Sequence, residues 1–287
     1  MADPEGVRSG DPELVASFFT LSGAGFGEPP RHTFPERCEA AAKAGFAGIG
    51  LHVDDLDRTR ESGLDDAGMR AVLNGTGLRL VEIEFLGGWA LDVDEKALAA
   101  TTAGVETVAD ALGGRHVSAG EFRPGRLDPD AAAARLAGLA ERLAERGLQV
   151  ALEAFPWSAL PDVDTAVDLL RRAGSPHAGL MIDVWHFFNG GAELDVLDDL
   201  PGAGVVAVQL NDGARVHADF LRHARAARRL PGYGQLDVVG LVRAVQAAGF
   251  AGPWCVEVNT PVFRGLAVED AARVAADAAM AVLDAAG

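Results

Sequence analysis

The chain has 287 residues, 49% of them hydrophobic, which is enough for one large α/β barrel or for two smaller domains. Its 25 basic and 42 acidic residues give a net charge of −17, and the sequence contains no Lys/Arg-rich run. This balance opposes binding to nucleic acid or to an anionic membrane, and it favours a small or neutral ligand.

Cys38 and Cys255 are too few for a disulfide framework or a thiolate metal site, and their places in an expected helix and an expected strand indicate buried thiols. The opening segment, MADPEGVRSGDPE, is polar and acidic and lacks the basic and apolar regions of a signal peptide. No apolar run approaches the roughly 20 residues of a membrane-spanning helix. We therefore expect a cytoplasmic protein without a membrane segment.

Short apolar runs alternate with helical patterns from end to end. Eight strands are predicted, at 14–21, 47–53, 78–86, 115–122, 148–155, 178–185, 204–211 and 253–259. Helical patterns lie between them, for example at 128–147 and 236–250, and a closing helix is expected near 267–286.

Turn and cap signals support these boundaries. The stretch Thr33-Phe34-Pro35-Glu36 has the form of a capping box with Pro in the first turn of a helix. Glycines stand where four helices should end, at Gly45, Gly147, Gly174 and Gly249.

Strands that each feed a helix returning to the next strand predict a parallel sheet. An eight-stranded barrel competes with an open doubly wound sheet, but no G-x-G-x-x-G follows the first strand, and the count of eight favours the barrel. No linker divides the chain, so residues 1–287 are predicted to form a single (β/α)8 TIM-barrel domain. In this fold the functional groups gather at the carboxyl ends of the strands.

Polar side chains end four consecutive predicted strands. Alternate residues of a strand face the same way, so these side chains can all point into the barrel. They are Glu153 on strand five, Asp183 on strand six, Gln209 on strand seven and Glu257 on strand eight. Three neighbouring carboxylates repel one another unless a cation joins them, and an all-oxygen set suits Mg²⁺ or Mn²⁺ better than Zn²⁺. Each acid taken alone would fit a buried salt bridge or a helix cap equally well.

The chain resembles the xylose isomerase-like TIM-barrel superfamily, the sugar phosphate isomerase/epimerase group that also contains tagatose-3-epimerase-type enzymes, inosose dehydratases and AP endonucleases. The resemblance covers nearly the full length. It rests on the Glu after strand five, D-V-W-H at 183–186, R-R-L-P-G-Y-G at 228–234 and V-E-V at 256–258.

This resemblance implies roles for individual residues. The metal ligands would be Glu153, Asp183, Gln209 and Glu257. His186 would contact the substrate or support the metal site, and Arg228 or Arg229 would bind substrate oxygens. Two positions depart from the family pattern: Gln209 stands where sugar epimerases commonly have His, and Tyr233 replaces the acid of P-G-E-G.

Further substrate-binding candidates follow other strand ends. His52 and Glu84 could hydrogen-bond a polyol, although both could equally be structural groups. The rings of Trp89, Trp157 and Trp185 suit the apolar face of a sugar or cyclitol. For Glu121 a loop salt bridge is the expected role.

The first functional hypothesis is a divalent-metal-dependent isomerase or epimerase acting on a ketose or keto-cyclitol. The metal would hold the carbonyl and the adjacent hydroxyl and stabilise the enediolate formed on proton loss. As the resemblance implies, Glu153 and Glu257 would remove and return the proton. The same enediolate can expel a β-hydroxyl, so a lyase (a dehydratase of the inosose or 3-dehydroshikimate type) is the close alternative.

Two other classes of protein remain as rivals. AP-endonuclease chemistry uses many His ligands and binds DNA, which disagrees with seven histidines and a charge of −17. A non-catalytic barrel that binds a metabolite or a partner subunit is supported by Gln209 in place of His. The expected partner is a small polyol or sugar-like molecule, with neither nucleic acid nor membrane. Barrels of this kind often pair, which makes a homodimer a further expectation.

Overall fold

The computed structural model describes residues 12–200 and 202–287, and in it eight parallel strands close into a barrel in sequence order. The strands are β1 (Leu14–Ala16), β2 (Gly48–His52), β3 (Arg79–Leu86), β4 (His116–Gly120), β5 (Gln149–Glu153), β6 (Ala178–Asp183), β7 (Val205–Leu210) and β8 (Trp254–Val256). Closure is made by β1, where Val15 pairs with Gly48 of β2 on one side and with Cys255 of β8 on the other. The predicted TIM barrel is confirmed.

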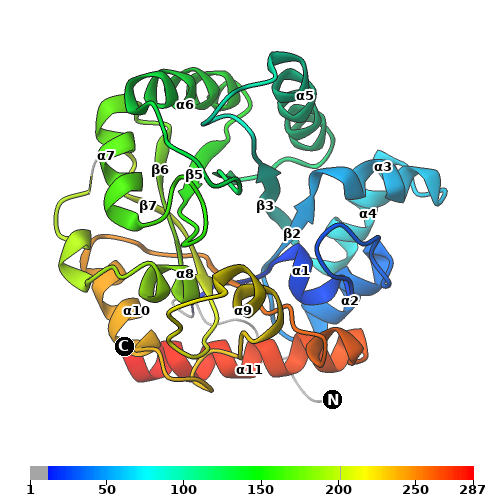
Figure 1. Cartoon of the computed structure of the whole chain (residues 1–287). Coiled ribbons are helices and arrows are strands. Elements are labelled where there is room, and N and C mark those ends of the chain that lie inside the picture. The colour runs from blue at the N-terminus through cyan, green and yellow to red at the C-terminus, as the bar shows by residue number, and fades with distance from the viewer. Residues whose placement is uncertain (1–11, 201) are drawn as a thin grey trace.

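Helices surround this barrel on the outside (Figure 1). They are α1 (Phe18–Leu21), α2 (Phe34–Lys43), α3 (Val53–Glu61), α4 (Asp66–Thr76), α5 (Glu95–Leu112), α6 (Pro129–Ala144), α7 (Val163–Ala173), α8 (Val184–Asn189), α9 (Phe220–Ala226), α10 (Val238–Ala247) and α11 (Val268–Ala286). Short 3-10 turns lie at Leu194–Leu197 and Phe263–Gly265. The closing helix α11 packs against α2 and α10 and joins the two ends of the barrel wall.

The main core lies between the strands and the helices. Residues on the outer faces of the strands, such as Ile49, Leu152 and Leu180, pack there with buried residues of the helices, such as Leu136 and Leu241. Small apolar clusters that include Ala151, Met181 and Val15 are separate from this core. This division fits a packed barrel interior enclosed by a second apolar layer.

The predicted helix signals are found at the expected places. Thr33 and Glu36 form a reciprocal capping box at the start of α2. The four glycines predicted to end helices all have positive φ, a conformation that disfavours residues with a Cβ atom.

All eight strands are shorter than the apolar runs that indicated them, and in two of the runs a helix begins before the run ends. The run 14–21 divides into β1 and α1, because the Ser17 side chain accepts a hydrogen bond from the backbone N–H of Phe19 and starts a helical turn. The run 178–185 ends as a strand at Asp183, whose carboxylate caps α8 by accepting from the N–H of His186 at 2.9 Å. Apolar content alone does not separate a strand from the short buried helix that follows it.

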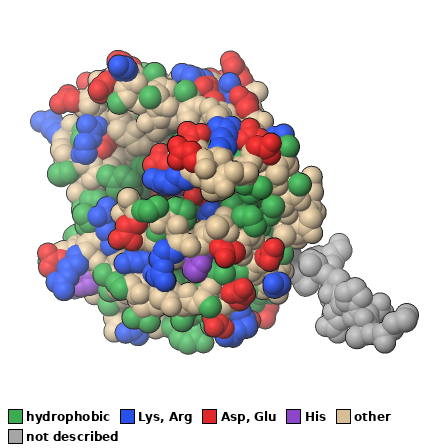
Figure 2. All heavy atoms as spheres, turned by 90° about the vertical axis from the view of Figure 1, so that its right-hand side faces the viewer, with side chains coloured by type: hydrophobic (Ala, Val, Ile, Leu, Met, Phe, Trp, Pro, Cys, Tyr) green, Lys and Arg blue, Asp and Glu red, His purple; other side chains and the backbone are tan. Residues whose placement is uncertain are grey.

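Acidic and basic side chains are interspersed over the face shown in Figure 2. Among the described residues, no helix combines the length and the apolar character that crossing a bilayer requires. The prediction about a signal peptide rests on the opening segment, and most of that segment, residues 1–11, lies outside the part that the structure describes.

Candidate functional site

A cavity of about 150 Å³ opens at the carboxyl end of the barrel. Glu153 is the last residue of β5, Gln209 lies one residue before the end of β7, and Glu257 directly follows β8. All three line the cavity. Asp183, the last residue of β6, lies beneath the lining with a fully buried side chain. The structure therefore brings the polar ends of four consecutive strands to one place.

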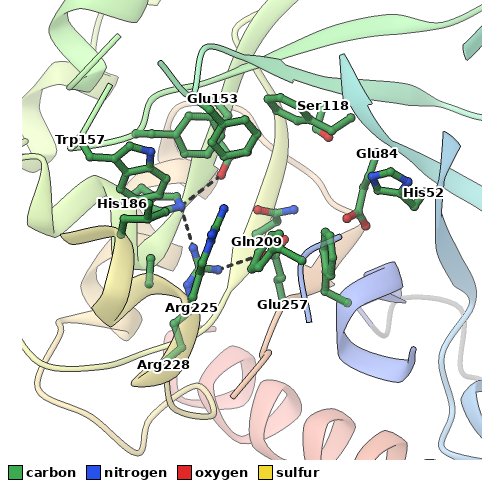
Figure 3. Close-up of a pocket in the computed structure, with 17 residues that line it drawn as sticks. His52, Glu84, Ser118, Glu153, Trp157, His186, Gln209, Arg225, Arg228 and Glu257 are labelled. Carbon is green, nitrogen blue, oxygen red and sulfur yellow. Dashed lines mark hydrogen bonds and ion pairs between the residues drawn. The ribbon is translucent and has the colours of Figure 1, made fainter. Parts of the chain in front are cut away.

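Arg228 connects three of the buried side chains. It lies after α9, and its Nη1 donates to Asp183 Oδ2 at 2.8 Å and to Glu257 Oε1 at 3.0 Å. Its Nη2 lies 2.7 Å from His186 Nε2 (Figure 3). Burial opposes the charge of this guanidinium, but Asp183, Glu257 and Glu153 outweigh burial and raise the pKa of Arg228. Arg228 is thus a permanently charged link in the wall of the cavity.

The carboxylates carry more negative charge than one arginine balances. Burial, with repulsion from Asp183 and Glu257, holds the pKa of Glu153 well above its ordinary value. Burial also raises the pKa of Glu257 to about 8, although Arg228 works in the opposite direction. Both groups would bind a cation or a proton in this environment.

His186 is held as a neutral imidazole, because burial lowers its pKa to about 3. An arginine can only donate, so Nε2 of His186 is the acceptor in the contact with Arg228. The same Nε2 lies 3.7 Å from Glu153 Oε1. His186 therefore helps to place the arginine and lies close to the glutamate.

The donor set fits a divalent cation. Ligand atoms of Glu153, Asp183 and His186 all lie within 4.8 Å of one another. The buried Oε1 of Gln209 has no hydrogen-bond partner among the described residues, which is costly for an amide oxygen and is relieved when a metal accepts it as a ligand. The cluster can thus hold a metal, and His186, which the resemblance places at the substrate or in support of the metal site, lies beside it.

Glu84 and His52 lie on the side of the cavity away from His186 and Trp157 (Figure 3). Glu84 Oε1 accepts from the N–H of Phe18 at 2.9 Å, and burial, followed by repulsion from Glu82 and Glu257, raises the pKa of Glu84 well above its ordinary value. His52 Nδ1 accepts from the N–H of Asp54 at the start of α3, and burial lowers its pKa.

Arg229, Trp185 and Trp89 do not line the cavity. Arg229 turns away and donates to the carbonyl of Tyr233 at 3.1 Å. Trp185 is 1% exposed and packs against Gly213, because the chain enters α8 directly after Asp183 and the alternation of the strand stops there. Trp89 is fully buried in the main core. Trp157, in contrast, lines the cavity.

Much of the outer cavity is aromatic, which the sequence analysis largely missed. Phe122 lies between Phe85 and Phe155, with ring centroids at 4.6 and 4.5 Å, and Trp157 lies 5.3 Å from Phe155. Across the opening, Phe19 and Phe26 are 4.3 Å apart. Three of these rings lie at the carboxyl ends of strands: Phe85 near the end of β3, Phe122 after β4 and Phe155 after β5. This position is the sequence signal by which they could be found.

Arg225 of α9 also lines the cavity and was not among the sequence candidates. Its guanidinium lies 5.0 Å from the ring centre of Phe26. Within residues 12–200 and 202–287, no ion pair or hydrogen bond engages this guanidinium. Glu121, by comparison, is paired with Arg123 at 2.8 Å, as the expected loop salt bridge requires.

Comparisons with known proteins identify relatives of this chain. The chain is 31% identical over 253 residues to a 3-dehydroshikimate dehydratase of Pseudomonas aeruginosa, which covers 81% of this chain and 37% of that protein. It is 24% identical over 150 residues to an inosose isomerase of Halalkalibacterium halodurans, which covers 52% of each chain. The chain thus spans only about a third to a half of the length of these relatives.

Solved structures show the same fold. The IOLI protein, whose structure holds a zinc atom, superposes with a TM-score of 0.84 at 18% identity, covering 95% of this chain and 98% of that one. The family model described as xylose isomerase-like TIM barrel matches residues 38–284. The chain therefore belongs to the xylose isomerase-like TIM-barrel family.

Proposed function

We propose that the chain is a divalent-metal-dependent enzyme that removes a proton next to the carbonyl of a small cyclic hydroxy-ketone. The observation that carries this proposal is that Glu153, Glu257 and Gln209, with its unpartnered Oε1, line one cavity, while the buried Asp183 shares Arg228 with Glu257. The three carboxylates and the Gln209 oxygen would hold the metal, as the sequence predicts. The bound metal would supply Lewis-acid stabilisation of the negative charge that develops on the substrate oxygens.

The residues of the chain would then perform the proton transfers. Glu153 or Glu257, as a carboxylate, would take the proton from the carbon next to the carbonyl. Arg228 fixes the Glu257 carboxylate, and His186 lies against Glu153. Glu84 lines the cavity as well, and burial, followed by repulsion from Glu82 and Glu257, raises its pKa, so it would give a proton to a substrate hydroxyl.

Dehydration is the outcome that the cavity supports best. After the C–H proton has passed to a glutamate, the electron pair forms a C=C bond, the β C–O bond breaks, and the hydroxyl leaves as water with a proton from an acid such as Glu84. The aromatic walls suit a ring that becomes flat and unsaturated. This reverses the order of the sequence hypotheses, which placed isomerisation before elimination.

Arg225 favours an acidic ring as the substrate. Arg228 is already engaged by Asp183, Glu257 and His186, whereas Arg225 is free to pair with a ligand anion at the rim of the cavity. The Arg225 guanidinium is exposed beside the ring of Phe26, where the carboxylate of an acidic ligand can reach it. The substrate class is therefore a keto-cyclohexene or keto-cyclohexane carboxylate of the 3-dehydroshikimate type.

Isomerisation of a keto-cyclitol is the second candidate. It is supported by the similarity to an inosose isomerase and by Glu153 and Glu257 at the cavity, one for each proton transfer.

An assay of 3-dehydroshikimate and keto-inositols with Mn²⁺, Mg²⁺ or Co²⁺ tests both candidates. We expect an aromatic product from 3-dehydroshikimate, detected by its ultraviolet absorbance, and loss of turnover on chelation. Failure to convert any keto ring, together with no exchange of substrate C–H for solvent deuterium with any metal, would refute the proposed function.

A further inference from the structure

Beneath the cavity lies a buried carboxylate that the proposed reaction does not use. Glu82 of β3 is 0% exposed and does not line the cavity. Its Oε1 accepts from Gln209 Nε2 at 3.1 Å and lies 3.5 Å from His116 Nε2, while its Oε2 accepts from the Cys255 thiol at 3.3 Å. Glu82 thus joins side chains of β4, β7 and β8 across the barrel interior.

The contact with Gln209 decides which way its amide points. A carboxylate only accepts hydrogen bonds, and the two oxygens of Glu82 accept from the Gln209 amide and from the Cys255 thiol. A glutamine amide can donate only through its nitrogen. The nitrogen of Gln209 must therefore face Glu82, and Oε1 must face away. Turning the amide over would place its oxygen against the oxygen of Glu82, an unfavourable contact.

The free Oε1 is the consequence of this orientation. It is buried and has no partner among the described residues, although a buried acceptor without a partner is costly. Glu82 thus holds the amide of Gln209 with its oxygen unpaired. A metal cation would satisfy this oxygen by accepting one of its lone pairs.

We propose that Glu82 is a positioning residue for the metal site: it holds Gln209 so that Oε1, and not Nε2, faces the cation. This inference rests on the proposed function, because it assumes the metal. Groups that orient a metal ligand through its second polar atom typically contribute about 10–100-fold in metal affinity. Glu82 would also explain how a glutamine serves at a strand end where related enzymes commonly use histidine.

Mn²⁺ titration calorimetry of the purified chain tests the inference. Glu82→Leu removes the acceptor at similar volume, and the affinity for Mn²⁺ should fall about 10–100-fold. Cys255→Ala is the matched control, because it removes a donor to the other oxygen of Glu82 on the strand beside Gln209 and leaves the hydrogen bond between Gln209 and Glu82 in place, so the affinity should fall far less. Circular dichroism and melting temperature establish that each variant is folded, and Glu82→Met replaces the leucine variant if that one does not fold.

A double-mutant cycle separates orientation from general support of the fold. Glutamate at position 209 offers an oxygen in either orientation and repels Glu82. In the Gln209→Glu background, Glu82→Leu should therefore raise the Mn²⁺ affinity, the reverse of its effect with Gln209. Equal losses in both backgrounds, or an unchanged affinity for Glu82→Leu alone, would overturn the role of Glu82 while leaving the metal site intact. A wild-type chain that binds neither Mn²⁺, Mg²⁺ nor Zn²⁺ would overturn the proposed function and this inference together.

Discussion

At the scale of single residues, Glu153 and Glu257 provide the most direct test of mechanism. Glu153→Gln and Glu257→Gln each keep an oxygen that can bind a metal but remove the base. We expect metal content to be largely retained and turnover to fall by about 10² or more, in line with loss of a general base.

Solvent deuterium exchange distinguishes the two glutamates. The residue that takes the first proton should abolish exchange of the substrate C–H when it is replaced, whereas a variant that lacks only the second group can still exchange. If both variants keep near-normal turnover with metal bound, the glutamates are ligands only and the base lies elsewhere. His186 is then the next group to replace.

Arg225 offers a test of substrate charge. Arg225→Met should raise KM for 3-dehydroshikimate about 10–100-fold, because a hydrogen bond to a charged group contributes about 1.5–3 kcal/mol. Turnover of a neutral keto-inositol should not change. Arg222→Met is the matched control, since Arg222 lies on the same helix and does not line the cavity. An equal effect of Arg225→Met on acidic and neutral substrates would contradict the assignment.

At the scale of elements, the junction of β6 and α8 combines a structural and a functional duty in Asp183. Its Oδ1 caps α8, while its Oδ2 accepts from Arg228 and from Asn211 Nδ2 at 2.7 Å. Asparagine caps helices nearly as well as aspartate but has no second acceptor and no charge.

Replacement of Asp183 should therefore separate metal binding from folding. Asp183→Asn should weaken Mn²⁺ binding while the barrel keeps its fold. Asp183→Ala should lose a further ~1 kcal/mol of stability with the cap. Calorimetric metal titration and urea unfolding measure the two effects. Equal stability of the two variants would show that the cap contributes little to α8.

The same junctions show how far the sequence can be used for prediction. The sequence predicts that one end of the barrel holds Glu153, Gln209 and Glu257, because the alternation of a strand and its carboxyl end are local properties of the chain. Trp185 was expected beside them but is buried in the core, because the cap formed by Asp183 replaces the strand by a helix. Apolar periodicity cannot predict that change.

Other parts of the cavity come from loops, whose direction no local pattern encodes. Arg228 and Arg229 are adjacent in sequence, yet one pairs with Asp183 and the other donates to Tyr233. The two side chains point in different directions because the backbone of Arg229 pairs with the backbone of Asp212, which follows β7. Phe26 and Arg225 meet over an even longer separation in the chain.

At the scale of the whole molecule, the buried acids should make the stability of the metal-free protein depend on pH. Glu257 has a folded-state pKa of about 8, and that of Glu153 is also raised. An acid whose pKa is raised on folding contributes stability that is fully present below its unfolded value near 4.5 and is lost as pH rises through the folded value. His186 has a lowered pKa of about 3, so its contribution is lost only as pH falls below about 6.5.

Between pH 7 and pH 9, then, only the glutamates act, and the melting temperature of the chelated protein should fall. Each kcal/mol of lost stability lowers it by about 2–4 °C in a domain of this kind. Excess Mg²⁺ should reverse the trend, because the ligands must be deprotonated to bind and the affinity for the metal rises with pH. Glu257→Gln should flatten the fall in the chelated protein, since it removes one of the titrating groups. A melting temperature that stays constant or rises from pH 7 to pH 9 without metal would show that these carboxyl groups are already ionised in the folded barrel, and that Arg228 alone balances their charge.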